Sequence, residues 1–377
     1  MTAPIGYFVH HQGRGHAERA AAIAAALPPD RPITLFTARA DIFPALPPQA
    51  RVVTIPSLFE PPAAPPVGFA KDRTPDTLHC APLGWSTITE AVATIAAWFD
   101  SARPALFVTD VSAELGQLAR IASVPHVAVL QHGDRADPGH MAAYEGAIGI
   151  LAPYHPSLEQ PGRPDWMTAK THYAPGVGID ADMPDRATAR AVLGLPADAE
   201  IVLAVGGGGG GGTPVTPLTL GARAEPDSLW ITIGEVQHDW HATPPANLRH
   251  MGWVANPEHW IAAADRIVSS AGNTTVHMIA AAGRPWIVVP EWRYFDEQLW
   301  KARMLGAASA AVTLDHWPSH GLAWRHAWQA ARACDPTRQR DLVDPDAAAG
   351  AAAWLDRLAR WRDVEPAASI LVAEPIA

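Results

Sequence analysis

The sequence lacks most features that mark secreted, membrane or nucleic-acid-binding proteins. Its 377 residues include only two cysteines, Cys80 and Cys334, which argues against a disulfide framework or a cysteine-rich metal site. Basic residues are few: 28 Lys and Arg against 38 Asp and Glu give a formal net charge of -10, with no basic stripe for nucleic acid. No apolar run approaches the roughly 18 residues of a membrane-spanning helix, and no secretory signal pattern opens the chain. We therefore expect a soluble cytoplasmic protein, monomeric or homodimeric.

Two glycine-rich turns resemble phosphate motifs but are incomplete. Gly13 and Gly15 follow the first predicted strand, yet Glu18 stands where the third glycine of the dinucleotide fingerprint belongs. Seven consecutive glycines, Gly206 to Gly212, follow a later strand without the Lys-Ser or Lys-Thr pair of a P-loop. A glycine run is costly to order, but its bare N–H groups can surround an anion. We expect this run to bind phosphate; the alternative is a flexible linker.

Apolar runs bounded by turn residues predict repeated βα units in both halves of the chain. The predicted fold class is therefore α/β, with two Rossmann-like domains facing across a cleft. A chain of 377 residues is also too long for one ordinary hydrophobic core, which favours two domains. We expect an N-terminal domain over residues 1–165, a C-terminal domain over 166–350, and a helix and tail over 351–377 that can cross back to the first domain. The Pro- and Gly-rich stretch 152–182 is predicted to be the connection, and 60–77 a mobile loop over the site.

The segment from Arg266 to Arg303 organises the second half. A short strand, Ile267–Val268, leads into a polar turn and a predicted helix that stops at Gly283. A second strand, Trp286 to Val289, precedes a polar cluster that opens another helix. Both polar clusters follow strands of a parallel sheet, and ligands of such sheets bind beyond the carboxyl ends of the strands. We therefore expect the clusters to converge on one crevice.

Three stretches, His11 to Ala26, Val205 to Gly212 and Ser270 to Arg303, resemble the nucleotide-sugar glycosyltransferases with the GT-B fold, most of all the MurG-like family. The resemblance implies that the second domain binds the donor. Its diphosphate would lie on the glycine loop and the next helix start, its base near Trp253 and Val254, and its sugar hydroxyls on Glu297 and Gln298. The implied donor-binding residues are Gly207, Gly208, Gly209, Gly210, Trp253, Val254, Gly272, Asn273, Thr274, Thr275, His277, Glu297 and Gln298.

Met278 departs from the family pattern, because it stands where the family commonly has a glutamate that holds the ribose. A thioether is a weak hydrogen-bond acceptor. Either the neighbouring His277 substitutes, or the ribose is held elsewhere.

His16 is the candidate general base, because histidine exchanges protons near neutral pH and His16 follows the first glycine turn. Related enzymes often orient such a histidine with an aspartate at a later strand end, where this chain has Asp110. The alternatives are a capping or phosphate-binding role for His16 and an N-cap role for Asp110. The candidate acceptor-binding residues are His11, Gly13, Arg14, Trp85 and His132.

Together with the resemblance, these features predict an inverting, metal-independent hexosyltransferase that uses a nucleotide sugar, UDP-sugar favoured, and a small acceptor. The acceptor pocket fits a small natural product of secondary metabolism as well as a lipid-linked sugar, and the lack of an obvious basic, apolar membrane-facing patch favours a soluble acceptor. No cofactor is expected. The pair Asp180 and Asp182 imitates a metal-binding motif but lies in the predicted connection. The alternatives are a nucleotide-sugar epimerase or hydrolase on the same scaffold, or a non-catalytic nucleotide-sugar-binding protein.

Overall fold

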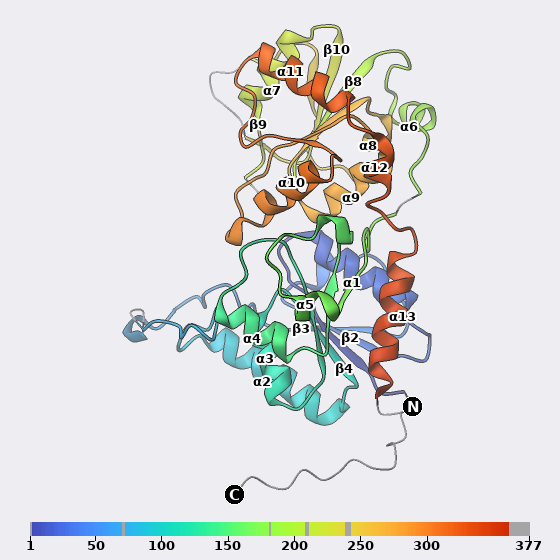
Figure 1. Ribbon diagram of the computed structural model, residues 1–377. Helices are drawn as coiled ribbons and strands as arrows, with labels where there is room; N and C mark the ends of the chain where they lie inside the picture. Colours follow the sequence, from blue (N-terminus) through green and yellow to red (C-terminus); the bar gives the residue numbers. More distant parts are fainter. Residues whose placement is uncertain (1, 70–71, 181, 208–210, 238–242, 362–377) are drawn as a thin grey trace, which may run out of the picture.

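The computed structural model describes residues 2–69, 72–180, 182–207, 211–237 and 243–361. They form two α/β domains, drawn one above the other in Figure 1, each built around a parallel sheet flanked by helices. The fold class expected from the sequence is confirmed.

The N-terminal sheet has seven parallel strands in the order β3-β2-β1-β4-β5-β6-β7. Ile5 pairs with both Ile33 and Leu106, so β1 is an interior strand between β2 and β4. Its buried side chains, such as Tyr7 and Phe8, leave no polar face, as expected of a sheet covered on both sides. The elements of this half are β1 (Ile5–Phe8), α1 (Arg14–Ala26), β2 (Ile33–Thr37), β3 (Ala50–Thr54), α2 (Ser86–Ala102), β4 (Leu106–Asp110), α3 (Ala113–Ile121), β5 (His126–Val129), α4 (Pro138–Gly146), β6 (Gly149–Ala152), α5 (Asp165–Ala169) and β7 (Thr171–Tyr173).

The C-terminal sheet has six parallel strands in the order β12-β10-β8-β13-β14-β15. The strand that precedes the glycine run, β8, pairs with β10 and β13. The elements are α6 (Arg186–Leu193), β8 (Glu200–Val205), β9 (Thr213–Pro214), α7 (Val215–Ala224), β10 (Ser228–Ile233), β11 (Val236–Gln237), β12 (Leu248–His250), α8 (Pro257–Ala263), β13 (Arg266–Ser269), α9 (Asn273–Ala282), β14 (Trp286–Val288), α10 (Glu297–Ala307), β15 (Val312–Thr313), α11 (Gly321–Arg332) and α12 (Pro336–Arg340). The predicted helix end at Gly283 is confirmed, because this residue caps α9 with φ 60.

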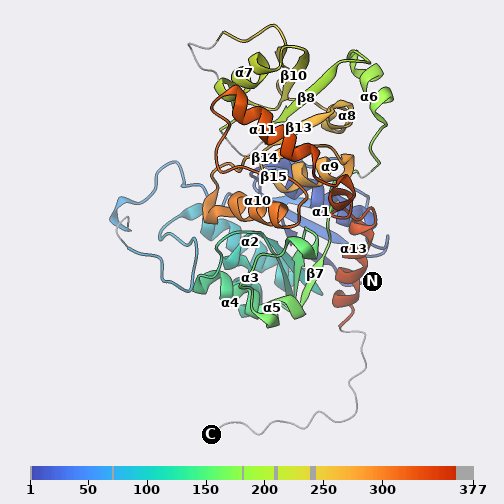
Figure 2. The ribbon, with the colours of Figure 1, turned by 45° about the horizontal axis from the view of Figure 1, so that its top comes forward.

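The helix α13 (Ala347–Ala359) belongs to the core of the N-terminal domain and lies beside α1 in Figures 1 and 2. Its Ala351 and Leu355 are fully buried there. Asp356 accepts a hydrogen bond from the buried Arg31 at 2.7 Å. The chain therefore crosses between the domains twice.

The stretch 152–182 contains more structure than the sequence predicts. Its edge strand β7 pairs Thr171 with Ile150 and completes the first sheet. A strand of only three residues among Pro and Gly carries no readable alternation, so the apolar pattern could not show it. The domains also share packed side chains: one apolar cluster runs from Tyr154 and Leu158 to Ile279 and Ala302.

Candidate active site between the domains

A cavity of about 750 Å³ lies where the two domains meet. This volume is typical of sites for small organic ligands. The N-terminal domain contributes His11, Gln12, Gly13, Arg14, Gly15, His16, Glu18, Arg19, Arg39, Asp41, Ile42 and Gln131. The C-terminal domain contributes Gly207, Trp253, Val254, Ala255, Pro257, Gly272, Asn273, Thr274, Thr275, Met278, Arg293, Glu297 and Gln298. The glycine turn after β1 and the polar turn after β13 thus open onto one cavity.

The starts of α1 and α9 touch across this cavity, and Figure 2 shows the two helices close together. Gly13 enters α1 with φ 83, a conformation that favours glycine. A Cβ added to Gly15 would come within 2.4 Å of Thr274 Oγ1. The second glycine of the turn is therefore required by the close approach of the C-terminal domain.

His16, Asp110 and Arg19 form a compact polar group at the N-terminal side of the cavity. His16 Nδ1 lies 3.1 Å from Asp110 Oδ1, and Arg19 Nη2 lies 2.6 Å from Asp110 Oδ2. The carboxylate is fully buried, while the imidazole keeps about a fifth of its surface exposed. Burial by itself raises the pKa of Asp110, but the charges of Arg19 and His16 outweigh it and hold that pKa well below its usual range. Asp110 is therefore a carboxylate at neutral pH.

The contacts of this group favour one tautomer of His16. Arg19 Nη2 also lies 3.0 Å from His16 Nδ1, so this nitrogen either accepts from Arg19 or donates to Asp110. If it accepted, Asp110 Oδ1 would have no hydrogen-bond partner among the described residues. An unpaired buried acceptor costs about 1–3 kcal/mol. A proton on Nδ1 satisfies the carboxylate and leaves Nε2 free to take a proton.

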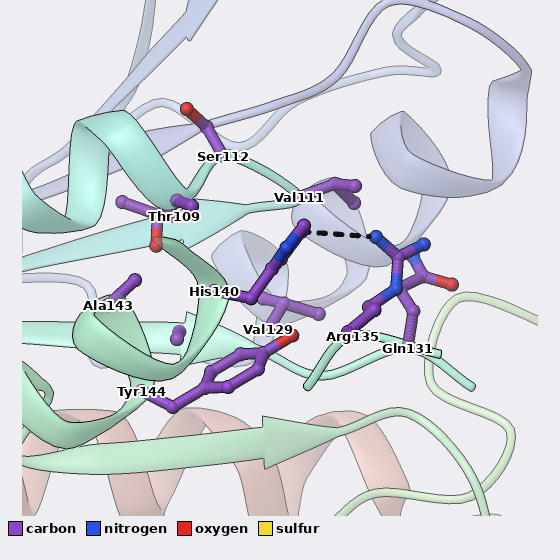
Figure 3. A pocket seen from close by; sticks show the side chains of 11 residues that line it. Thr109, Val111, Ser112, Val129, Gln131, Arg135, His140, Ala143 and Tyr144 are labelled. Carbon is purple, nitrogen blue, oxygen red and sulfur yellow. Dashed lines mark hydrogen bonds between the residues drawn. The ribbon is translucent and has the colours of Figure 1, made fainter. Parts of the chain in front are cut away.

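The backbone after Asp110 turns sharply. Val111 has φ 69, which is strained for a β-branched residue. Ser112, not Asp110, caps α3, since its side chain accepts from Leu115 N at 3.2 Å. Behind this turn is a small cavity of about 20 Å³, room for about one water molecule. Figure 3 shows it between Val111, Tyr144 and His140, with the contact from His140 to Arg135 drawn as a dashed line.

The two histidines before His16 have different surroundings. The His10 ring stacks on His11 and on Phe59. Burial, with added effects of His16 and His11, lowers the pKa of His10 to about 3, so it is neutral at physiological pH. His11 lines the cavity, and its Nε2 lies 3.1 Å from Glu60 Oε1. Of these histidines, only His16 contacts a buried carboxylate.

On the C-terminal side of the cavity, the first turn of α9 presents backbone groups without a side-chain cap. Gly272 is its N-cap, so the first N–H groups of the helix have no capping partner. Such amides attract anions. Behind them the buried Lys301 donates to Asn273 Oδ1 at 2.5 Å. Burial lowers the pKa of Lys301 to about 8, although Glu297 opposes the shift.

The glycine run is described only in part. Gly207 lines the cavity, and Gly212 has φ 86. Gly208, Gly209 and Gly210 lie outside the described residues. An added Cβ at Gly207 would meet Ser270 Oγ only at 3.5 Å, an ordinary contact. The open backbone here leaves space for a ligand.

Glu297 and Gln298, at the start of α10, already accept hydrogen bonds within the protein. Gln298 Oε1 accepts from Ala271 N at 3.0 Å and from Glu291 N at 2.9 Å. Its NH₂ group therefore remains as the free end of the side chain. Glu297 accepts from Arg135 of the N-terminal domain at 3.2 Å. Both residues line the cavity, and each also accepts a hydrogen bond from another segment of the protein.

Besides the fully buried Asp110, three described candidate residues do not line the cavity. His277 is buried with its Nε2 unpartnered among the described residues, and burial together with Lys301 lowers its pKa to about 3. His132 is also buried and contacts Leu158 O at 2.7 Å through Nε2. Trp85 precedes α2 as its N-cap. In contrast, Trp253 lines the cavity with 66% of its surface exposed.

Arg19 and Glu18 line the cavity but are not among the candidate residues predicted from the sequence. Arg19 lies three residues after His16 in an alanine-rich helix, and that spacing puts both on one face. A charged residue at this spacing in an apolar helix was the available signal. Glu18 has no hydrogen bond or ion pair within the part of the chain that the structure describes, and burial raises its pKa.

The architecture can be compared with that of known proteins. No protein-family model and no curated protein matches the sequence. Solved structures do match. MurG of Acinetobacter baumannii has a TM-score of 0.61 at 14% identity, covering 95% of this chain and 100% of its own. UGT71G1 of Medicago truncatula, complexed with UDP-glucose, has a TM-score of 0.62 at 14% identity, covering 95% and 98%. The spinosyn rhamnosyltransferase SpnG, complexed with thymidine diphosphate, has a TM-score of 0.62 at 16% identity, covering 94% and 99%.

The chain has the GT-B fold. Both parallel sheets fit it, so the resemblance seen in the sequence is confirmed at the level of architecture. In the described part of this GT-B chain, no helix is long and apolar enough to cross a membrane. Within the same residues, no three His, Cys, Asp or Glu side chains gather as a metal-binding group.

Proposed function

We propose that this GT-B protein is an inverting glycosyltransferase that moves a hexose from a nucleoside diphosphate donor to a hydroxyl group of a small acceptor. The observation that carries the proposal is the meeting of two chemistries in one cavity. A histidine backed by a buried carboxylate lies on one side, and uncapped helix amides lie on the other. A hydroxyl nucleophile needs the first, and a departing diphosphate needs the second.

In the proposed reaction, His16 Nε2 takes the proton of the acceptor hydroxyl while its oxygen bonds to the anomeric carbon of the donor sugar. The bond from that carbon to the diphosphate oxygen breaks on the opposite face, so the configuration inverts. Asp110, 3.1 Å from His16 Nδ1, stabilises the imidazolium that forms. The nucleoside diphosphate leaves with the bonding electrons.

The diphosphate is proposed to lie on the amides at the start of α9 and on Gly207, both of which line the cavity. Lys301, buried behind Asn273, adds positive potential without an exposed lysine. This arrangement suits a protein with few basic residues. The base is proposed to lie near Trp253 and Val254, where the exposed indole offers a stacking surface.

The donor class is tested by titrating the full-length protein with UDP, thymidine diphosphate and GDP, and then with their glucose conjugates. The solved structures that resemble this chain include complexes with UDP-glucose and with thymidine diphosphate, so both bases belong in the panel. We expect binding of one diphosphate, UDP first, and slow release of free sugar without an acceptor. An added panel of small hydroxyl compounds should yield a glycoside of inverted configuration.

Other outcomes of this panel identify the competing functions. An epimeric nucleotide sugar as the product would indicate an isomerase. Fast hydrolysis that no acceptor diverts would indicate a hydrolase. Tight binding without turnover would indicate a binding protein. Absence of binding to every diphosphate would contradict the proposed function.

A further inference from the structure

Arg19 is a buried cation in direct contact with both members of the His16–Asp110 pair. It is only 3% exposed and lies on α1 one turn after His16. Its Nη2 is 2.6 Å from Asp110 Oδ2 and 3.0 Å from His16 Nδ1. Arginine keeps its charge at any physiological pH. The carboxylate behind His16 is therefore shared between an imidazole and a permanent cation.

The charged and titratable groups around these three residues come from several elements. They are Tyr7, His10 and His11 from β1 and the turn after it, Arg14 and Glu18 from α1, Arg135 from the loop after β5, and His277 and Lys301 from α9 and α10. Burial raises the pKa of Tyr7 and lowers those of His10 and His277 to about 3, so these three are uncharged near pH 7. Burial lowers the pKa of Lys301 to about 8. The charges in direct contact with the His16 ring are those of Asp110 and Arg19.

We infer that Arg19 is a positioning residue for the proposed transfer: it fixes the Asp110 carboxylate on His16 Nδ1, so that Nε2 stays available to take a proton. The inference rests on the proposed function. Because Arg19 holds Oδ2, the other carboxylate oxygen stays on His16 Nδ1. Asp110 alone would favour the imidazolium, and the guanidinium charge opposes this effect. The group thereby gives His16 a fixed orientation and a free Nε2 where transfer takes place.

The test compares Arg19→Gln with Arg19→Lys. The glutamine can still donate an N–H towards Asp110 but has no charge, whereas the lysine keeps the charge. With Gln, the acid limb of the kcat/KM profile between pH 5 and 7.5 should move up by about one pH unit. The KM for the donor should change little. With Lys, the limb should return towards that of the wild type.

Arg31→Met is the matched control. Arg31 is equally buried, lies in the same domain, and pairs with Asp356 of α13 at 2.7 Å and not with His16 or Asp110. Loss of either buried ion pair should lower the thermal midpoint, but only Arg19→Gln should move the pH profile. An equal shift in both, or no shift in Arg19→Gln, would overturn the inference.

A second measurement does not depend on turnover. In protein labelled with ¹⁵N-histidine, the ring of His16 is assigned by its loss in His16→Gln and followed from pH 4.5 to 7.5. We expect Nδ1 to carry the proton in the wild type and the titration midpoint to rise in Arg19→Gln. If no nucleotide sugar is turned over, the proposed function fails while this titration still decides the role of Arg19. Superimposable titration curves would refute that role.

Discussion

The two helix starts that meet across the cavity, α1 and α9, carry different polar groups. At α1 the polar groups are side chains: His16 contacts Asp110, and Asp110 contacts Arg19. At α9 they are backbone amides, with Gly272 providing no side-chain cap. A side-chain group needs a supporting network, so single substitutions should be severe there. A backbone group survives most substitutions and is weakened mainly by added bulk.

The largest effect is expected from His16→Ala. Loss of the proposed base should lower kcat by about 10²–10⁴-fold, because proton transfer from the acceptor is then left to water. Donor affinity should stay within a few fold, since the diphosphate is proposed to lie on the other side. Steady-state kinetics and calorimetric titration check both values, and His259→Ala, at the edge of α8 beside Glu258, is the control. Retained activity within a few fold would remove His16 from its proposed role.

Gly15→Ala tests the contact between the two helix starts. Its Cβ would come within 2.4 Å of Thr274 Oγ1, so we expect a loss of about 1–3 kcal/mol in the free energy of unfolding. Thr274→Ala removes the clashing oxygen, whose neighbouring Cβ lies at 3.7 Å, and should restore most of the loss. Chemical denaturation of the single and double variants measures the coupling. Additive losses would mean that the helices do not touch in solution.

Gly207→Ala probes the backbone side. Its new methyl group meets only Ser270 Oγ at 3.5 Å, so the fold should be kept. If the diphosphate lies on this backbone, its Kd should rise about tenfold, comparable to the loss of one hydrogen bond. Gly350→Ala in α13, whose added Cβ would meet only His172 Nε2 at 4.0 Å, is a control for a general glycine effect. An unchanged Kd would place the diphosphate elsewhere.

The smallest effect is expected in the acid stability of Asp110→Asn. The pKa of Asp110 is lowered in the folded state, so its contribution to stability is full above the unfolded pKa near 4. That contribution is lost as the pH falls towards the folded value. Between pH 4 and 2.5 the unfolding free energy of Asp110→Asn should therefore fall less steeply than that of the wild type. Denaturant titrations at several pH values measure the slopes, and equal slopes would contradict the assignment.

The sequence predicts the parts of the fold that repeat. The strand predicted over Trp286 to Val289 forms as β14 (Trp286–Val288), and the glycine turn after β1 marks the start of α1. Short elements escape, as β7 does, because three residues cannot show a period. Most residues of α1 are alanine, so its sequence alone does not show that Arg19 contacts His16.

For the site, the sequence could bring residues to one sheet edge but could not say which side chains are already engaged. Glu297 looks available as a carboxylate, yet it pairs with Arg135, which lies far away in the chain. His277 looks like a neighbour of Met278, but helical geometry turns it inward, where it is buried. Adjacent helix positions point about 100° apart, so only one of the two can face the cavity. The ion pair of Glu297 and the burial of His277 both depend on packing between segments that are distant in the sequence.

The return of α13 to the first domain has a consequence for biosynthesis. Ala351 and Leu355 complete the core around α1, and they are translated after the whole C-terminal domain. Domains usually fold in the order in which they leave the ribosome. In this chain the domain that is translated first is completed last, so a nascent chain carries an unfinished amino-terminal core until α13 has been translated.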